Sequence, residues 1–356
     1  MLAGCRFAHF LQYGLRAQER EPAEFDSRFY GTFVHDVLEY IVQQTEREGG
    51  FAAVPRSRVQ ELAQERMEQN AQTLLETFPD SGRTGYLLRR TFDEVTQVVD
   101  ELYDELSVSA FRPKFCELEF SAHGALPGVA FAGERCRGVV EGFVDRVDVW
   151  QSGGRPYVRV VDYKTGKKSF DYTNVLHGRG LQMLLYLFAL VRQGGHLLHG
   201  EPLPAGVLYF PARIERVSVR DRLAQAEIEK ERRKQLRRSG VLLNSDPVLE
   251  AMEPCGGSPR FLPYTLDKEG RKTGDLASFA QLAQLERFVF QTVAALGDEL
   301  ADGRIDPDPC IRDAKDSACA FCPYSEVCAG HEQPRWLKKI TAEEFWQTLE
   351  RRKTDG

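Results

Sequence analysis

A carboxylate and an amine end an apolar segment near the middle of the chain. In residues 158–164, alternate side chains of an extended backbone point to one face, which begins with Val158 and Val160. The same face ends with Asp162 and Lys164. A buried strand rarely ends in such a charged pair unless the pair binds or reacts with something, so we expect chemistry at Asp162 and Lys164.

A second carboxylate lies on the neighbouring predicted strand. Residues 139–150 are typical of one strand, which would pair with the first through a Gly-Gly turn at 153–154. This hairpin would bring Asp145 within reach of Asp162. Two carboxylates beside an ammonium group suit a hard divalent cation such as Mg²⁺, which takes oxygen ligands and keeps several waters. Lys164 could then orient or deprotonate a metal-bound water, or offset the charge that develops on a phosphate.

Gln182 and Tyr186 follow on a predicted helix, where a spacing of four residues places both side chains on one face. An Asp on one strand, Asp-x-Lys on the next and Gln-x-x-x-Tyr on the helix that follows resemble the RecB-type branch of the PD-(D/E)XK nucleases. The resemblance implies an α/β fold with a restriction-endonuclease-like core, in which helices flank a mixed central sheet. It also implies that the catalytic set is Asp145, Asp162, Lys164, Gln182 and Tyr186.

An earlier histidine joins this set through the resemblance. The sequence predicts a helix from Gly31 to Ile41 with Thr32 as a possible N-cap, and an apolar stripe of this helix runs beside His35. Taken alone, a helix histidine beside apolar neighbours is more often a packed residue than a ligand. The Gly-x-x-x-His pattern ending at His35 resembles the metal-site histidine of RecB-type nucleases and reverses that balance. By resemblance, the ligands of Mg²⁺ or Mn²⁺ would be His35, Asp145, Asp162 and the backbone carbonyl of Tyr163.

The chain contains eight cysteines, whose spacing indicates metal binding more than disulfides in a reducing compartment. Cys319, Cys322 and Cys328 are close enough in sequence to bind one centre, and the proline after Cys322 resembles iron-sulphur ligand loops. Cys310 is the nearest fourth ligand in sequence. In AddB-type nuclease domains and in related iron-sulphur nucleases of CRISPR systems, a distant N-terminal cysteine completes a 4Fe-4S cluster, and this resemblance points to Cys5. A tetrahedral zinc site stays open, because thiolates alone do not tell zinc from iron.

Other polar features allow two interpretations. Residues 115–120 are typical of the first core strand, and Glu119 is either the early acidic residue of the family or a solvated carboxylate. The charged segment 213–238 is either a solvated helix face or a contact to the DNA backbone. Cys116 and Cys136 are best taken as small core residues, and Cys255 as a bystander.

Composition describes a globular chain without a membrane segment. The 356 residues are 42% hydrophobic, which is enough for one large domain or two. A net charge of -6 excludes a uniformly basic coat for nucleic acid but permits a local basic channel. No apolar run approaches the length of a membrane span, and the sequence does not start with a signal peptide, so we expect a cytoplasmic location.

The resemblance to AddB-type nuclease domains spans nearly the whole chain. It implies one domain with a catalytic core at 111–212, and Mg²⁺-dependent hydrolysis of DNA, as an exonuclease on single strands that an AddA-type helicase partner delivers during double-strand break processing. Residues 166–169 lack a complete phosphate-binding loop, so we expect no ATPase activity from them. The other predicted regions are an N-terminal cysteine segment (1–30), a helical region (31–110), an insertion (213–285), and C-terminal helices with the cysteine cluster (286–356).

Two alternative functions stay open at this stage. The chain could be a catalytically silent module that binds DNA or scaffolds a helicase-nuclease complex, or a stand-alone nuclease with zinc or with a cluster of the CRISPR-associated type. The intact set of Asp145, Asp162 and Lys164 favours an enzyme, because a decayed site would have lost at least one of them.

Overall fold

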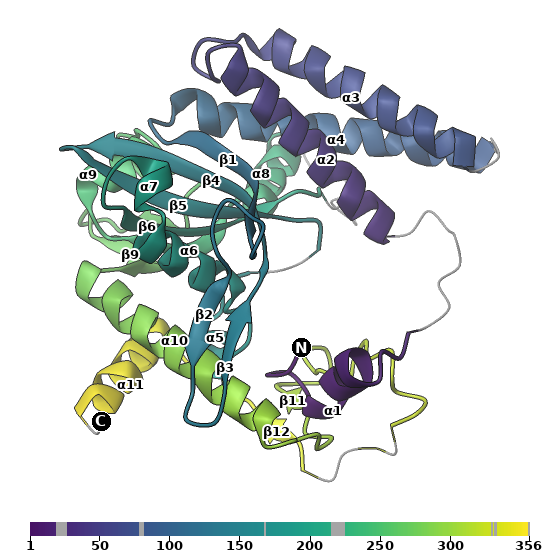
Figure 1. The fold of residues 1–356 in the computed structure, drawn as a ribbon. Coiled ribbons are helices and arrows are strands. Elements are labelled where there is room, and N and C mark those ends of the chain that lie inside the picture. The colour runs from purple at the N-terminus through teal and green to yellow at the C-terminus, as the bar shows by residue number, and fades with distance from the viewer. Residues whose placement is uncertain are drawn as a thin grey trace.

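A mixed sheet of six strands forms the centre of this computed structural model, in the order β1-β4-β5-β6-β7-β10 (Figure 1). The structure describes residues 1–18, 27–77, 82–166, 169–214, 225–328, 330 and 333–354. The sheet strands are β1 (Arg112–Phe120), β4 (Gly142–Ser152), β5 (Arg155–Lys164), β6 (Leu203–Pro211), β7 (Ser239–Leu243) and β10 (Leu276–Ala277). This arrangement confirms the predicted mixed central sheet with flanking helices.

Strands β4 and β5 pair through the predicted turn. Ser152 pairs with Arg155, and the turn between them uses Gly153 and Gly154 with φ values of 57° and 76°. Two positive φ angles in a two-residue loop match the right-handed twist of the flanking strands, and glycine adopts them without steric cost. Further along the same ladder Arg146 pairs with Val161, so Asp145 and Asp162, one position beyond this pair, lie on adjacent strands.

The prediction of a single strand at 139–150 is wrong, because the chain forms parts of two strands there. β3 (Arg137–Val140) pairs with β2 (Val129–Ala132) in a separate hairpin, and β4 begins at Gly142. Gly142 has a φ of 155°, and a Cβ at this position would lie 2.1 Å from the hydroxyl oxygen of Tyr186. The backbone therefore turns where a buried tyrosine occupies the space of a side chain, which only glycine permits.

The step from β5 to β6 is parallel, so it needs a crossover. The crossover contains α5 (Tyr172–Leu176), α6 (Gln182–Gln193) and α7 (Gly195–Leu198). α6 packs on β5 and β6 with an almost continuous buried stretch, and α10 (Phe279–Ala301) packs on α6. α11 (Ala342–Thr354) covers α10 and α5, so these helices form one layer of the fold (Figure 1).

Three long helices form a second layer, which we call the helical cap: α2 (Ser27–Arg47), α3 (Arg56–Thr77) and α4 (Gly82–Val108). α2 contacts β1 and β4 and lies on the other side of the sheet from α10 (Figure 1). Val34, Val37 and Leu38 of α2 are fully buried. The predicted N-cap at Thr32 is wrong, since the helix already begins at Ser27.

Part of the predicted insertion at 213–285 belongs to the core. β7 pairs antiparallel with β6, and β10 pairs parallel with β7, so both strands extend the central sheet. The rest of the segment contains α8 (Gln225–Leu236), α9 (Asp246–Met252) and a hairpin of β8 (Tyr264–Leu266) with β9 (Lys272–Gly274). Residues 215–224 of the charged segment lie outside the described residues.

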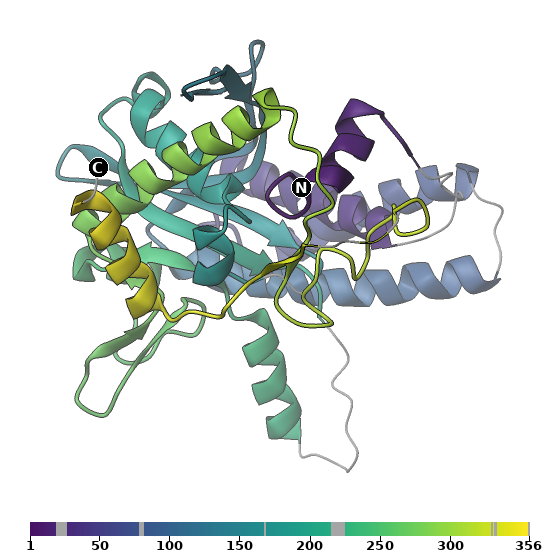
Figure 2. The same ribbon diagram turned by 90° about the horizontal axis from the view of Figure 1, so that it is seen from below.

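The N-terminal segment meets residues 306–336 in a small unit, which we call the cysteine lobe. It contains α1 (Arg6–His9) and a π-helical turn (Phe10–Gly14), which lie beside β11 (Cys310–Ile311) and β12 (Arg335–Trp336) (Figures 1 and 2). The amide of Phe7 donates to the carbonyl of Asp306 at 3.1 Å, and the amide of Cys310 donates to the carbonyl of Gly4 at 2.7 Å. Among the described helices of the whole chain, none is long and apolar enough to cross a membrane.

Buried ion pairs join the helical cap to the sheet, and we call this set the ionic network. Glu105 of α4 accepts from Arg159 of β5 at 3.0 Å and from Arg238 at 2.8 Å. Asp148 of β4 accepts from Arg159 at 2.8 Å and from Arg146 at 2.8 and 3.1 Å. All five side chains are at most 2% exposed. The network therefore links helix α4, strands β4 and β5, and the residue before β7 in one continuous chain of contacts.

Removal of the central carboxylate should destabilise the fold. Burial alone would raise the pKa of Glu105, but Arg238, Arg159 and Arg146 lower it from 4.5 to about 2. Because the folded-state pKa is depressed, this stabilisation is present above pH 4.5 and is lost as the pH falls toward 2. We expect Glu105→Ala to lower the free energy of unfolding by about 3–5 kcal/mol, because buried arginines lose their counter-charge.

Urea denaturation at pH 7 measures this effect, with Glu61→Ala as the control, since Glu61 is an exposed cap residue that pairs with Arg58. The control should change stability by less than about 1 kcal/mol. An equal, small change in both variants would show that Glu105 is not needed as a counter-charge.

Candidate active site

The β4-β5 hairpin brings the two predicted carboxylates together. Arg146 of β4 pairs with Val161 of β5, so Asp145, the residue before Arg146, lies next to Asp162, the residue after Val161. A carboxylate oxygen of Asp145 accepts the backbone amide of Tyr163 at 2.6 Å, which orients its side chain along the end of β5. Asp162 forms an ion pair with Lys164 on the same face of β5, as alternation along the strand predicts. Both aspartate side chains are largely buried, at 14% and 12% exposure.

His35 approaches this edge from the helical cap. Its Nε2 lies 2.9 Å from the carbonyl oxygen of Tyr163, and its Nδ1 lies 3.6 Å from a carboxylate oxygen of Asp145. The imidazole ring also meets the ring of Tyr163 edge-on, with centroids 5.8 Å apart. The structure therefore brings together His35, Asp145 and the carbonyl of Tyr163, three of the four ligands that the resemblance assigned to one cation. The fourth, Asp162, pairs with Lys164.

A further carboxylate, which sequence reasoning missed, belongs to the same group. Glu117 of β1, His35 and Asp145 offer ligand atoms that all lie within 4.8 Å of one another. Its neighbours Cys116 and Leu118 pair with Arg146 and Val144, so Glu117 stands opposite Asp145 in the β1-β4 ladder. Pairing the strands predicted at 115–120 and 139–150 around Asp145 could have identified Glu117 from the sequence.

Glu119, the acidic candidate of the sequence analysis, lies elsewhere. Its carboxylate accepts the hydroxyl of Ser121 at 2.7 Å. Glu117 has a left-handed backbone, with a φ of 48°, which is uncommon for a residue other than glycine. Alternation alone places Glu117 and Glu119 on one face of β1, so the pairing of β1 with β4 distinguishes them.

Burial and mutual repulsion of the carboxylates at this site favour the binding of a cation. Burial raises the pKa of Asp145, and the neighbouring Asp162 raises it further, while His35 and the amide of Tyr163 oppose the shift. Burial and then Asp145 raise the pKa of Glu117 in the same way. Several carboxylates that crowd one half-buried space favour protonation or a bound cation. One imidazole and several carboxylate oxygens, with a free carbonyl lone pair nearby, form a donor set that fits Mg²⁺ or Mn²⁺.

Gln182 and Tyr186 lie one turn apart at the start of α6. Tyr186 is buried, stacks on Phe120 with ring centroids 4.8 Å apart, and donates its hydroxyl to the carbonyl of Glu141 at 3.2 Å. Gln182 is exposed and hydrogen-bonds with the hydroxyl group of Tyr186. These contacts support the first residues of β4, the strand that carries Asp145.

The cysteine lobe contains a second group of potential ligands. Cys5 from the N-terminal segment and Cys319, Cys322 and Cys328 from the C-terminal segment line one cavity of about 190 Å³. Burial raises the pKa of the Cys319 thiol, and the thiols of Cys5, Cys322 and Cys328 add to this shift. The four thiols therefore lie close together in the fold, although one is more than 300 residues away from the others.

Cys310 points away from this cavity. It is fully buried, and its thiol lies 3.2 Å from the carbonyl oxygen of Ala3. Cys116 packs at the edge of the main core, and burial raises the pKa of its thiol to about 12. The thiol of Cys255 contacts the carbonyl of Gly257, outside both groups.

Comparisons with known proteins agree with this geometry. The family model for the PD-(D/E)XK nuclease superfamily matches residues 1–329. The chain is 34% identical over 92% of its length to an ATP-dependent helicase/deoxyribonuclease subunit of Moorella thermoacetica, and covers 29% of that protein. It is 29% identical over 98% of its length to the subunit of the same name from Thermoanaerobacter sp. strain X514, of which it covers 31%.

The chain spans less than a third of the length of these relatives. A third relative, the helicase/deoxyribonuclease subunit of Oceanobacillus iheyensis, is 28% identical over 91% of the chain. The resemblance seen in the sequence is confirmed, since the matched region contains both the carboxylate site and the four clustered cysteines. The chain belongs to the PD-(D/E)XK nuclease superfamily.

Proposed function

We propose that the chain is a metal-dependent deoxyribonuclease module that hydrolyses phosphodiester bonds in DNA. The observation that carries the proposal is the convergence of His35, Glu117 and Asp145 on one space, beside the carbonyl of Tyr163 and the Asp162-Lys164 pair. The names of its relatives, each an ATP-dependent helicase/deoxyribonuclease subunit, support DNA as the substrate.

The ligands of Mg²⁺ or Mn²⁺ in this proposal are His35, Glu117, Asp145, Asp162 and the carbonyl of Tyr163. A bound divalent cation supplies a Lewis acid for the phosphoryl oxygen and lowers the pKa of a water molecule. Lys164 holds its ammonium group beside Asp162, where it can orient the attacking water and offset charge that develops on the phosphate. Tyr186 and Gln182 support the backbone of β4 and so orient Asp145.

The substrate in this proposal is a single DNA strand that a helicase partner of the AddA type delivers during double-strand break repair. The printed names of the relatives combine a helicase and a deoxyribonuclease, which supports such a complex. The net charge of -6 means that any contact to the DNA backbone is local. A cytoplasmic location and exonuclease action stay predictions.

A second metal centre is proposed in the cysteine lobe, where Cys5, Cys319, Cys322 and Cys328 hold a 4Fe-4S cluster. Four cysteines that line one cavity, and the proline after Cys322, support this proposal. A single zinc ion held by the same four thiolates is the alternative, and the metal content of the protein decides between them. The role of the centre is structural, because it joins the N-terminal segment to a C-terminal segment away from the carboxylate site.

The nuclease proposal predicts that Asp162→Ala abolishes cleavage and leaves the fold intact. The variant loses a cation ligand at the end of a strand and little apolar packing. We expect the rate on single-stranded DNA with Mg²⁺ to fall by at least about a thousandfold, the equivalent of about 4 kcal/mol of transition-state stabilisation. Asp302→Ala is the control, since Asp302 pairs with Arg135 on the surface. Full activity of Asp162→Ala would exclude Asp162 from the catalytic site, whereas a parent protein without Mg²⁺-dependent cleavage would favour the alternative of a silent DNA-binding module.

The metal proposal predicts that Glu117→Gln weakens cation binding. The substitution keeps the shape of the side chain and removes one negative charge from the group. We expect the Kd for Mn²⁺ to rise at least about tenfold, the equivalent of about 1.4 kcal/mol, in calorimetric titrations without DNA. Glu119→Gln, two positions along the same strand, is the matched control and should bind Mn²⁺ as the parent does. If Glu119→Gln weakened Mn²⁺ binding and Glu117→Gln did not, Glu119 would be the ligand.

The cluster proposal predicts that Cys5→Ala gives a colourless protein. Three thiolates cannot complete a four-cysteine centre, so iron and its folding energy would be lost together. We expect protein purified without oxygen to lose its visible absorption and iron content, and to become protease-sensitive near both termini. Cys255→Ala should resemble the parent. If Cys5→Ala kept its iron while Cys310→Ala lost it, the fourth ligand would be Cys310; a colourless parent that contains zinc would exclude the cluster.

A further inference from the structure

The proposed cation ligands come from two different layers of the fold. Asp145, Asp162 and Tyr163 belong to the central sheet, whereas His35 belongs to α2 of the helical cap. Ligands must keep their positions within about 0.5 Å to bind a cation well. The cap and the sheet must therefore keep one fixed position relative to each other.

Apolar packing between the two layers does not by itself provide this precision. Helix α2 packs on β1 and β4, and its residues Val34, Val37 and Leu38 are fully buried. Hydrophobic contact holds such surfaces together but has little directional preference. A shift of α2 along the sheet would move His35, so its position calls for directional contacts as well.

The ionic network provides directional contacts that orient the helical cap relative to the sheet. The guanidinium groups of Arg146 and Arg159 both bind Asp148, and Arg159 and Arg238 bind Glu105 of the cap. Planar guanidinium groups fix both the distance and the angle of a carboxylate. Charges buried this deeply lose hydration energy that largely offsets their attraction, so such a network contributes more to orientation than to stability.

Arg146 connects the network to the site itself. Its Nη1 donates to the hydroxyl of Tyr163 at 2.9 Å, and its guanidinium carbon lies 5.5 Å from the centre of the tyrosine ring. The amide of the same tyrosine donates to Asp145, and its carbonyl accepts from His35. Tyr163 is thus held at three points, and one of them is the end of the ionic network.

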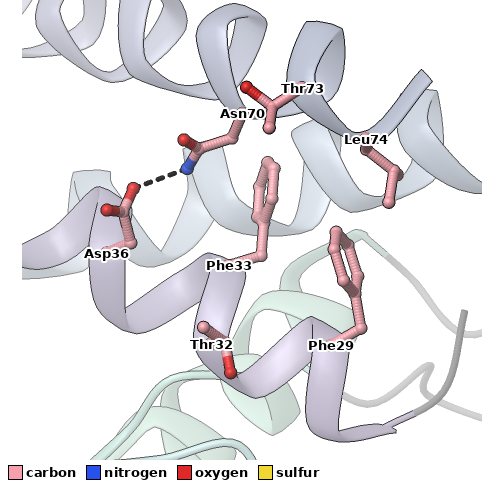
Figure 3. Close-up of a pocket in the computed structure, with 7 residues that line it drawn as sticks. All are labelled: Phe29, Thr32, Phe33, Asp36, Asn70, Thr73 and Leu74. Carbon is pink, nitrogen blue, oxygen red and sulfur yellow. Dashed lines mark hydrogen bonds between the residues drawn. The ribbon is translucent and has the colours of Figure 1, made fainter. Parts of the chain in front are cut away.

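Polar contacts inside the cap hold Asp36, the residue that follows His35 in α2. Asp36 forms an ion pair with Arg66 of α3 and accepts the side-chain amide of Asn70 at 2.5 Å. Figure 3 shows this contact of Asp36 with Asn70 at the edge of a cavity of about 340 Å³, which Phe29 and Phe33 also line. Helix α2 is therefore fixed to α3, so its position on the sheet follows that of the whole cap.

We propose that the ionic network positions the helical cap for cation binding, with Arg146 as a positioning residue that acts through Tyr163. The network holds Glu105 of the cap and Tyr163 of the sheet in one frame, and this frame sets the approach of His35 to the carbonyl of Tyr163. The proposal rests on the proposed function, since it concerns the same cation site. It adds a set of buried residues, outside the ligand group, that determine cation affinity.

The test removes one hydroxyl group. Tyr163→Phe keeps the ring and the backbone but breaks the contact with Arg146. Substitutions of groups that orient metal ligands typically weaken affinity 10–100-fold, and we expect the Kd for Mn²⁺ to rise about tenfold. Calorimetry and electron paramagnetic resonance of Mn²⁺ measure this without DNA, and urea denaturation of the same samples records stability.

Tyr103→Phe is the matched control. Tyr103 belongs to α4, its hydroxyl donates to the carbonyl of Val54 at 3.1 Å, and Arg56 lies over its ring. The control removes the same chemical group from the interior of the cap and should bind Mn²⁺ as the parent does. A parent-like Kd in Tyr163→Phe would overturn the proposal, as would an equal rise of the Kd in both variants, which would indicate general softening of the cap.

Two further variants separate this proposal from the proposed function. Arg146→Lys keeps the charge but loses the two-pronged contact with Asp148, and should raise the Kd at least as much as Tyr163→Phe. His35→Ala removes a proposed ligand directly. If His35→Ala bound Mn²⁺ as the parent does, the cation site itself would be misplaced. If His35→Ala lost Mn²⁺ while Tyr163→Phe and Arg146→Lys kept it, only the positioning role would fail.

Discussion

The peptide group of Tyr163 is the point on which the site depends. Its amide binds Asp145 at 2.6 Å, and its carbonyl meets His35 at 2.9 Å. The flanking residues, Asp162 and Lys164, point to the opposite side of β5 from the tyrosine ring. One strand end therefore fixes a carboxylate from β4 and a histidine from the cap, and presents a carboxylate and an amine of its own. Strand pairing sets the positions of the sheet residues, whereas the helical cap sets the position of His35.

Crowded negative charge is the cost of this arrangement. Burial and mutual repulsion raise the pKa values of Asp145 and Glu117, so the group of carboxylates destabilises the fold until a proton or a cation neutralises it. The ionic network differs from this group, because its buried charges are matched by partners at hydrogen-bonding distance.

The cysteine lobe has a different role, because it joins the N-terminal segment to residues 306–336. Arg6 forms ion pairs with Glu299 and Asp308, and the amide of Cys310 reaches the carbonyl of Gly4. A cross-link at Cys5 would close almost the whole chain into a loop, and the loss of unfolded-state entropy grows with loop length. The lobe has only a small apolar core, around Ala8, Leu11 and Tyr324, so a bound centre would add what packing does not provide.

Local sequence determined much of the site. The alternation of residues 158–164 located Asp162 and Lys164 on one face, and the turn at Gly153 and Gly154 placed Asp145 beside them. Both inferences succeed because strand alternation and hairpin register are short-range properties of the backbone. His35 and Cys5 came only from a resemblance in motif order, since no local rule connects residues so far apart in sequence.

Tertiary structure decided the remaining features. The register of β1 against β4, which alternation along β1 does not reveal, places Glu117 and not Glu119 opposite Asp145. The contact of Gly142 with Tyr186 divides the strand that alternation predicted as continuous. Arg146 and Arg159 belong to strands with an ordinary charged pattern, yet they are fully buried because Glu105, more than 40 residues earlier, neutralises them. The sequence by itself determined which strand ends carry Asp145, Asp162 and Lys164. Long-range packing decided which charges are buried and that the helical cap brings His35 to the site. The physical reason is that desolvation and ion pairing depend on neighbours that only the folded chain brings together.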